Sequence, residues 1–94
     1  MIAQVFTVGA PAEITPEDSK YVQDLMEEAR SREGCEGIYT LAADDGHGLA
    51  IVLWRDRAAL EAVSEQQQRD NQDLMAHGVP DPGPGTVYEV VAAL

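Results

Sequence analysis

The chain has 94 residues, enough for one small domain, which we place at residues 1–94, with a thin hydrophobic core. Hydrophobic residues make up 45% of the chain and charged residues 24%, which is typical of globular proteins and not of disordered or fibrous ones. Its 17 acidic and 6 basic side chains give a formal net charge of -11, which disfavours nucleic-acid and membrane partners because the field repels phosphates and anionic lipids.

The single cysteine, Cys35, excludes an intrachain disulfide and fits a reducing compartment. No apolar run approaches the roughly 20 residues of a membrane-spanning helix, and Met1 leads into a strand-like segment, not into a secretory leader. We therefore expect a cytoplasmic protein. Cys35 follows a predicted helix C-terminus and precedes Glu36, and both disfavour a reactive thiolate, so a structural role is favoured.

The elements predicted along the chain are strands and helices separated by glycine- and proline-containing turns. Short runs rich in β-branched and aromatic residues indicate strands, and apolar residues at helical spacing indicate helices. In chain order we expect a strand at residues 2–8, a helix that opens at 15–18 and stops at Gly34, strands at 38–43 and 49–54, a helix capped by Asp56 that stops at Gly78, and a strand at 86–94.

This β-α-β-β-α-β order is that of the ferredoxin-like α+β fold, an antiparallel sheet with both helices on one face. Residues 49–54 are apolar on both faces, so the sheet face opposite the helices would expose a large apolar patch on a monomer. We therefore expect two copies to pack sheet against sheet as a two-fold symmetric homodimer, a dimeric α+β barrel.

The segment Asp45-Gly46 between the second and third strands is typical of a hairpin with a type I′ turn. If the connection has two or four residues, Tyr39 pairs with Val52, and Tyr39 and Trp54 then project from one face as diagonal neighbours. A three-residue connection would break this arrangement. Together the two aromatic side chains would form the wall of a small pocket for a ring-shaped ligand, whereas the alternative for Trp54 is core filling.

The second helix contains a polar stretch from Glu65 to Asp73, and the sequence leaves open whether the helix is continuous or broken near it. In a regular helix, Gln67 and Asn71 would face the sheet, where buried amides need hydrogen-bond partners. Either this part overhangs the sheet and faces water, or a pocket lies beneath it and Gln67 or Asn71 orients a ligand.

Motifs for cofactors and metals are missing: the sequence has no glycine-rich phosphate loop, no paired-cysteine spacing and no nucleophile elbow. We therefore predict neither a cofactor nor a metal site. His47 and His77 are candidates for a general base only because imidazole titrates near neutral pH. For His77, at the end of the second helix, a favourable contact with the helix dipole is the simpler interpretation. Arg55 could supply a cation or pair with surface acids.

Three segments resemble the antibiotic biosynthesis monooxygenase family of the dimeric α+β barrel superfamily. These are the glycine-containing turn after the first helix, the apolar strand that ends in tryptophan and a charged pair before an Ala-Leu helix start, and the closing strand. The segments are Gly34-Cys35-Glu36-Gly37, Val52-Leu53-Trp54-Arg55-Asp56 with Ala58-Ala59-Leu60, and Tyr88-Glu89-Val90.

The resemblance implies a homodimer with ligand pockets between the sheet and the helices. Some members of the family oxidise polyphenolic, polyketide-type rings with molecular oxygen and without flavin, haem or metal, because the substrate anion itself reduces oxygen. Trp54 matches the family's strand-three tryptophan, which borders the site in such enzymes. Other members degrade haem with a strand-one asparagine, a helix-two histidine and an additional tryptophan. This chain has Gln4 and Thr7 in its first strand and no second tryptophan, so haem degradation is disfavoured.

Two functions of different class remain open. The first is a cofactor-independent monooxygenase that acts on an aromatic, quinol- or polyketide-like small molecule. The second is a non-catalytic small-molecule-binding or dimeric interaction module with the same fold. A purely structural dimer would instead have Trp54 and Tyr39 in a dry core with no cavity beside them.

Overall fold

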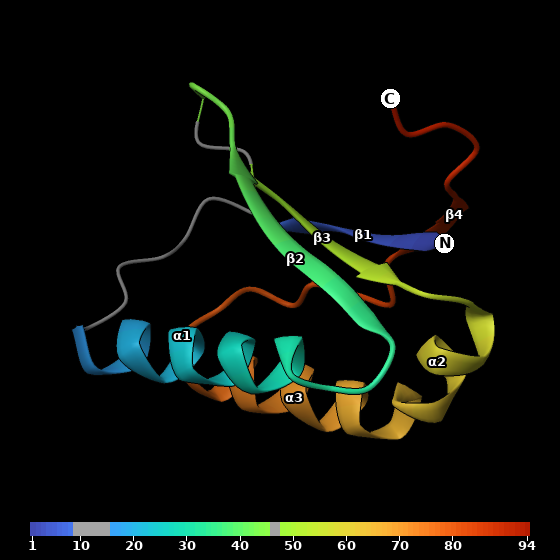
Figure 1. The fold of residues 1–94 in the computed structure, drawn as a ribbon. Helices are drawn as coiled ribbons and strands as arrows, with labels where there is room; N and C mark the ends of the chain where they lie inside the picture. The colour runs from blue at the N-terminus through green and yellow to red at the C-terminus, as the bar shows by residue number, and fades with distance from the viewer. Residues whose placement is uncertain (9–15, 46–47) are drawn as a thin grey trace.

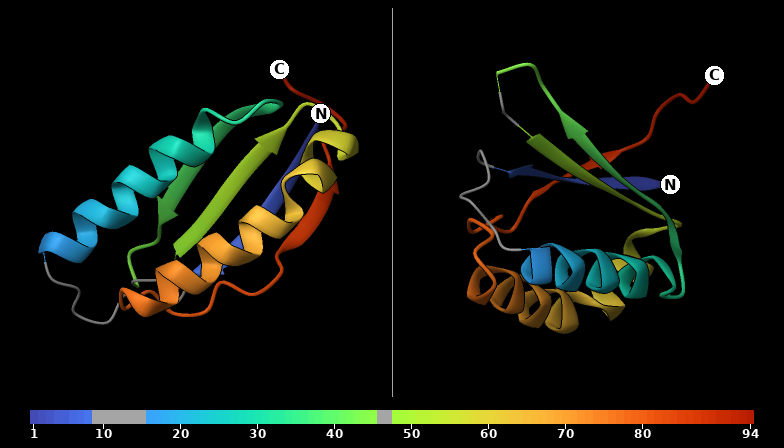
Figure 2. Two further views of the ribbon diagram at one scale, coloured as in Figure 1. Left: turned by 90° about the horizontal axis from the view of Figure 1, so that it is seen from below. Right: turned by 90° about the vertical axis from the view of Figure 1, so that its left-hand side faces the viewer.

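The computed structural model describes residues 1–8, 16–45 and 48–94. In these ranges the chain forms an antiparallel sheet of order β2-β3-β1-β4 and a layer of helices. Helices α1 and α3 cover the same face of the sheet (Figures 1 and 2), so the predicted ferredoxin-like α+β fold is confirmed. The elements are β1 (Ile2–Val8), α1 (Pro16–Arg30), β2 (Cys35–Ala42), β3 (Gly48–Trp54), α2 (Arg57–Ala62), α3 (Ser64–Ala76) and β4 (Thr86–Glu89).

Local sequence explains where the helices begin and end. Pro16 occupies the start of α1, where its missing N–H costs no hydrogen bond, and acidic Glu17 and Asp18 lie in the first turn. Gly34 follows the helix with φ +84°, a left-handed conformation that favours glycine. Asp56 caps α2, as predicted, because its carboxylate accepts a hydrogen bond of 2.9 Å from the backbone N–H of Ala59.

The second predicted helix is divided in two at Val63. This residue leaves the helical region with φ -111° and ψ 5°, so α2 ends before it and α3 begins after it in a different direction (Figure 1). Helix α3 then runs without a break through the polar stretch that the sequence had left ambiguous. The break therefore lies upstream of the polar residues, and their regular helical spacing is preserved.

The two faces of the sheet differ in burial. On the inner face, toward the helices, Ile2, Gln4 and Phe6 of β1 alternate with outward residues and are buried. Ala50 and Trp54 of β3 are also buried, and Trp54 is only 2% exposed. On the outer face the aromatic and aliphatic side chains of Tyr39, Leu41, Leu49 and Tyr88 are exposed.

One cluster of buried residues packs together at one end of the sheet. Ile2, Cys35, Trp54 and Ala59 form its centre, so it joins β1, β2 and β3 to the short helix α2. Cys35 is free and buried, which agrees with the structural role predicted for it. In contrast, α1 has no fully buried residue along its described length. The space between the sheet and the long helices is therefore incompletely filled by the chain's own side chains.

The predicted pairing of Tyr39 with Val52 is wrong. Tyr39 lies opposite Ile51, and the ladder ends with Ala42 opposite Gly48, so residues 43–47 connect the strands. An odd number of connecting residues reverses the face on which each side chain lies. Tyr39 therefore projects from the outer face and is 56% exposed, while Trp54 projects inward.

Other predictions about the strands also need correction. β4 ends at Glu89 and not at Leu94, although the backbone N–H of Val90 still donates to the carbonyl of Met1 at 3.0 Å. β2 begins at Cys35, three residues before its predicted start, with an irregular step between Cys35 and Gly37.

Thr15, the predicted turn residue Gly46, and His47 lie outside the described residues. No helix within the described ranges has the length and apolar character needed to cross a bilayer.

Candidate functional site

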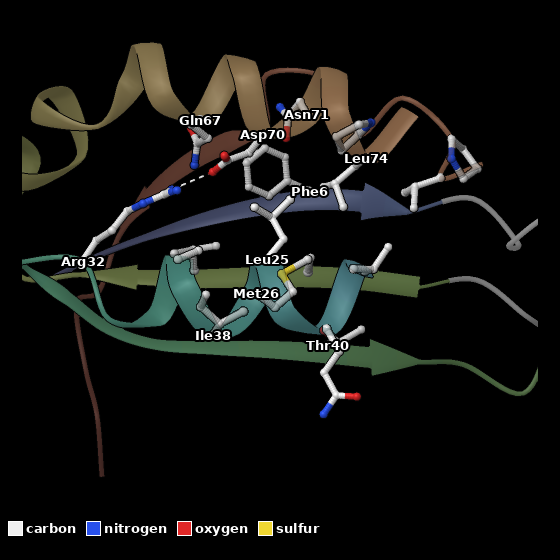
Figure 3. A pocket seen from close by; sticks show the side chains of 18 of the residues that line it. Phe6, Leu25, Met26, Arg32, Ile38, Thr40, Gln67, Asp70, Asn71 and Leu74 are labelled. Atoms are coloured by element: carbon white, nitrogen blue, oxygen red, sulfur yellow. Dashed lines mark ion pairs between the residues drawn. The ribbon is translucent and has the colours of Figure 1, made fainter. Parts of the chain in front are cut away.

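A cavity of about 500 Å³ lies between the inner face of the sheet and helices α1 and α3 (Figure 3). Val79, Pro80 and Pro82, in the segment after α3, line a third side of it. Aliphatic, aromatic and proline side chains make up most of its wall, and the polar groups are few. The residues that line it are Phe6, Ser19, Val22, Gln23, Leu25, Met26, Ala29, Arg32, Ile38, Thr40, Ala50, Val52, Trp54, Gln67, Asp70, Asn71, Leu74, Val79, Pro80 and Pro82.

Gln4, Gln67 and Trp54 hydrogen-bond to one another beside the cavity, and Gln67 and Trp54 line its wall. Gln4 and Gln67 form a reciprocal amide pair, with N···O distances of 2.9 and 2.7 Å. The indole N–H of Trp54 donates to the same Gln4 Oε1 at 3.3 Å. Gln4 is 4% exposed, so this network lies out of water and its polar atoms are largely satisfied within the chain. The network fixes the indole ring and joins β1 to α3.

An ion pair crosses the cavity between the end of α1 and the middle of α3. Arg32 Nη1 lies 2.7 Å from Asp70 Oδ2, and the two side chains are 15% and 9% exposed (Figure 3). The other carboxylate oxygen of Asp70 accepts a hydrogen bond of 3.0 Å from Gln66 Nε2. Arg32 Nη2 is buried without a hydrogen-bond partner among the described residues. The pair thus neutralises two charges that are shielded from solvent.

Asn71 differs from the paired amides Gln4 and Gln67. Its side chain lines the cavity beside Asp70 on α3 and is half-buried (Figure 3). Among the described residues, no partner accepts from or donates to this carboxamide. Asn71 therefore presents both a donor and an acceptor to whatever fills the cavity.

A second group of polar side chains connects the other ends of α1 and α3. His77 Nδ1 lies 2.8 Å from Asp18 Oδ1, and the imidazole stacks on Tyr21 with ring centroids 3.8 Å apart. Partial burial and the negative charges of Asp73 and Asp70 raise the pKa of the Tyr21 phenol above its ordinary value of 10.0. His77 also occupies the C-cap of α3, as predicted for a contact with the helix dipole.

The residues predicted for the site fall into three groups. Trp54, Gln67 and Asn71 come together on the cavity wall, and Gln67 faces the sheet, as a regular helix requires. Tyr39 lies on the opposite face of the sheet, so the predicted wall of Tyr39 and Trp54 does not form. Of the two histidines, His77 faces Asp18 and Tyr21, and His47 lies outside the described residues.

Three residues of the site escaped the sequence interpretation: Gln4, Arg32 and Asp70. Gln4 alternates with Ile2 and Phe6, so the period of a strand placed it on the buried face. Asp70 lies three residues after Gln67 and four before Leu74, which places it on the same face of the helix. For Arg32 the sequence contains no periodic pattern that predicts its orientation, because it lies in the turn after α1, which ends at Arg30.

Metal ligands are not gathered anywhere in residues 1–8, 16–45 and 48–94, since no group of three or more His, Cys, Asp or Glu side chains there is placed to hold an ion. Arg55, considered as a cation for the site, lies 3.6 Å from Asp56 on the exposed surface. Ionic chemistry at the cavity therefore rests on Arg32 and Asp70.

Comparison with solved structures identifies the fold. A protein from Deinococcus radiodurans, assigned by its name to the antibiotic biosynthesis monooxygenases, superposes with a TM-score of 0.68 at 20% identity, over 100% of this chain and 96% of that one. The chain shares the fold of the antibiotic biosynthesis monooxygenases. A second structure of that name matches with a TM-score of 0.61 at 25% identity, over 100% of both chains.

A protein from Nitrosomonas europaea that carries the same family name matches at 13% identity with a TM-score of 0.65, over 98% of this chain and 100% of that one. No family model matches the sequence, and no curated protein matches it significantly. The resemblance drawn from the sequence is therefore confirmed at the level of fold, and the chain spans nearly the full length of the proteins it resembles.

Proposed function

We propose that this protein binds an aromatic, quinol- or polyketide-like molecule in the cavity beside Trp54 and oxygenates it without an added cofactor. The observation that carries the proposal is the cavity itself, because about 500 Å³ of mostly apolar space suits a small polycyclic molecule. The antibiotic biosynthesis monooxygenase names of proteins with this fold support the reaction class.

The proposed reaction needs no external reductant. A methylene group between two aromatic rings becomes a carbonyl: one atom of O₂ enters the substrate, the other leaves as water, and the carbon supplies all four electrons. The protein's task is then to hold the substrate, exclude water and accept a proton when the substrate ionises.

Asp70 is the proton acceptor that we propose. It is the carboxylate among the described residues that line the cavity, and Arg32 is the cation. When a proton moves from the substrate to a carboxylate oxygen of Asp70, Arg32 becomes the counter-cation of the substrate anion. The total charge of the cavity stays constant, which limits the cost of forming an anion away from water.

A non-catalytic binding module is the second candidate. One observation favours it: both oxygens of Asp70 are already engaged, one with Arg32 and the other with Gln66. A substrate proton could reach either oxygen only by displacing one of these two contacts. The same cavity would then bind its ligand without transforming it.

Incubation with a panel of reduced polycyclic phenols under isotopically labelled oxygen distinguishes the two candidates. The monooxygenase hypothesis predicts one labelled oxygen atom per product molecule, detected by mass spectrometry. Asp70→Asn should reduce turnover by roughly 100-fold or more, the range expected when a proton acceptor is lost. Asp24→Asn, which removes the same charge from an exposed position on α1, should leave turnover unchanged.

Two possible outcomes of this experiment would each reject a different part of the proposal. Binding of panel members without label in any product would reject the oxygenase and support the binding module. Equal turnover by wild type and Asp70→Asn would reject the role of Asp70 while leaving the reaction class standing.

The same proposal includes a homodimer, which pairs through the outer face of the sheet, and a cytoplasmic location. The exposed apolar side chains of that face support the dimer, and the free Cys35 thiol fits the reducing cytoplasm.

A further inference from the structure

The charged side chains that line the cavity indicate which net charge its ligand can have. Arg32 and Asp70 are the charged side chains among its described lining residues, and they lie 2.7 Å apart. Their charges sum to zero. An ionised guest would therefore bring an uncompensated charge into mostly apolar surroundings, which is costly unless the charge is paired.

The wider electrostatics act in the same direction for anions. The chain carries a formal net charge of -11, so its field opposes the approach of a carboxylate or phosphate. Arg32 does not offset this effect, because Asp70 holds one of its terminal nitrogens and the other is buried. Selection against anions thus depends on Asp70 staying paired with Arg32.

The hydrogen-bonding groups at the cavity indicate which polar group the ligand should carry. Trp54, Gln4 and Gln67 satisfy one another, so a guest gains little by competing for their polar atoms. Asn71 is half-buried on the cavity wall and engages no partner in the described part of the chain. A ligand hydroxyl or carbonyl opposite this amide would satisfy a group that otherwise loses water on binding.

We infer that the cavity selects an uncharged aromatic molecule whose hydroxyl or carbonyl oxygen hydrogen-bonds to Asn71, and that the Arg32–Asp70 pair enforces selection against ionised molecules. The inference rests on the proposed function only in placing the ligand in this cavity. It concerns binding, so it holds or fails independently of catalysis.

Equilibrium dialysis near neutral pH with three probes of similar size tests it: β-naphthol, which is neutral and has one hydroxyl, naphthalene, which has none, and β-naphthoate, an anion. Wild type should bind β-naphthol more tightly than naphthalene by roughly 2- to 12-fold, the range for one hydrogen bond. It should bind β-naphthoate about 30-fold or more weakly than β-naphthol, because the anion lacks a partner.

Asn71→Leu should abolish the difference between β-naphthol and naphthalene. Gln72→Leu, which likewise replaces a carboxamide with leucine, at the exposed neighbouring position of α3, should preserve it. Asp70→Asn should leave Arg32 unpaired and reverse the charge preference, so that β-naphthoate binds more tightly than β-naphthol. Asp24→Asn makes the same change in net charge at an exposed site and should not reverse it.

Wild type alone can overturn the inference: it is wrong if β-naphthoate binds as tightly as β-naphthol, or if none of the three probes binds. Retention of the β-naphthol preference by Asn71→Leu would reject the role of that amide, and this comparison does not require Asp70→Asn to fold. If the binding pattern holds but no phenol of the labelled-oxygen panel is oxidised, the proposed reaction fails and the ligand selection stands.

Discussion

At the scale of single residues, Gln4 determines how the site is held together. Its carboxamide accepts from Trp54 and Gln67 through one oxygen and donates to Gln67 through its nitrogen. Replacing it removes partners from two other buried or half-buried side chains at once. Because an unsatisfied buried polar group costs more than a hydrogen bond contributes, the effect should exceed that of an ordinary surface substitution.

We predict that Gln4→Leu destabilises the protein by about 1–3 kcal/mol, measured by urea denaturation, because Trp54 Nε1 and the Gln67 amide lose their partner. The double variant Gln4→Leu/Gln67→Leu should cost less than the sum of the single changes, since it removes both members of the amide pair.

Gln68→Leu, at an exposed position next to Gln67, is the matched control and should change the free energy of unfolding by less than about 0.5 kcal/mol. Strict additivity of the two single substitutions in the double variant would contradict the network, because independent side chains show no coupling energy.

The residue scale also shows where prediction from sequence stops. Gln67 and Asn71 were found from helical spacing alone, and that spacing held because α3 is regular through the polar stretch. The pairing of Arg32 with Asp70 joins positions far apart in the chain, so no local pattern contains it. Gln4 lay on a predictable face, but only the fold shows that its neighbour across the space is Gln67.

At the scale of elements, the helices differ in how much they contribute to the buried core. The short helix α2 places Ala59 in the core with Trp54, whereas α1 contributes no fully buried side chain along its described length. The apolar stripe of α1 instead lines the cavity through Val22, Leu25 and Met26. Hydrophobic periodicity therefore predicted which face of α1 turns inward, but it does not distinguish a packed core from the wall of a cavity.

The hairpin between β2 and β3 shows a second limit. The cluster of turn residues between these strands indicated a hairpin correctly, but it did not define how many residues connect them. Residues 43–47 do so, and this odd number moves Tyr39 to the face opposite Trp54. The residue patterns and turn residues were enough to predict that two strands are joined here as a hairpin. The face on which each strand residue lies could not be predicted, because it reverses when the connecting loop is one residue longer or shorter.

The turn between α1 and β2 depends on a close approach to α2. Gly34 has φ +84°, and a Cβ atom added there would overlap the side chain of Ala59. We predict that Gly34→Ala destabilises the protein by about 2–4 kcal/mol, from the left-handed backbone together with overpacking against α2. Thermal or urea denaturation followed by circular dichroism measures it.

Gly83→Ala is the control for the backbone contribution. Gly83 also has a positive φ, +67°, but a Cβ added there meets no atom within 4 Å. The substitution should therefore cost only the backbone strain, about 1–2 kcal/mol. Equal destabilisation by the two substitutions would show that the packing of α2 against the turn contributes nothing.

At the scale of the whole molecule, the sheet has apolar side chains on both faces, but helices cover only one. Tyr39, Leu41, Leu49 and Tyr88 are exposed on the outer face by 56%, 46%, 38% and 54%. The core of the single chain is small, and a cavity occupies part of the space on the inner face of the sheet. Burial of the outer face against a partner would therefore add stability that the isolated chain lacks. A second copy offers a matching apolar surface through two-fold symmetry.

We predict that light scattering at micromolar concentration finds a dimer of the 10.2 kDa chain, and that Leu49→Glu converts it to a monomer. Leu49 lies opposite Leu41 and Thr7 on the outer face, so a glutamate there would bring unpaired charge into the interface without entering the cavity. Gln68→Glu adds the same charge on the exposed face of α3 and should leave the dimer intact. A monodisperse 10.2 kDa particle for the wild type would reject sheet-to-sheet pairing, and the outer face would then stay in contact with water.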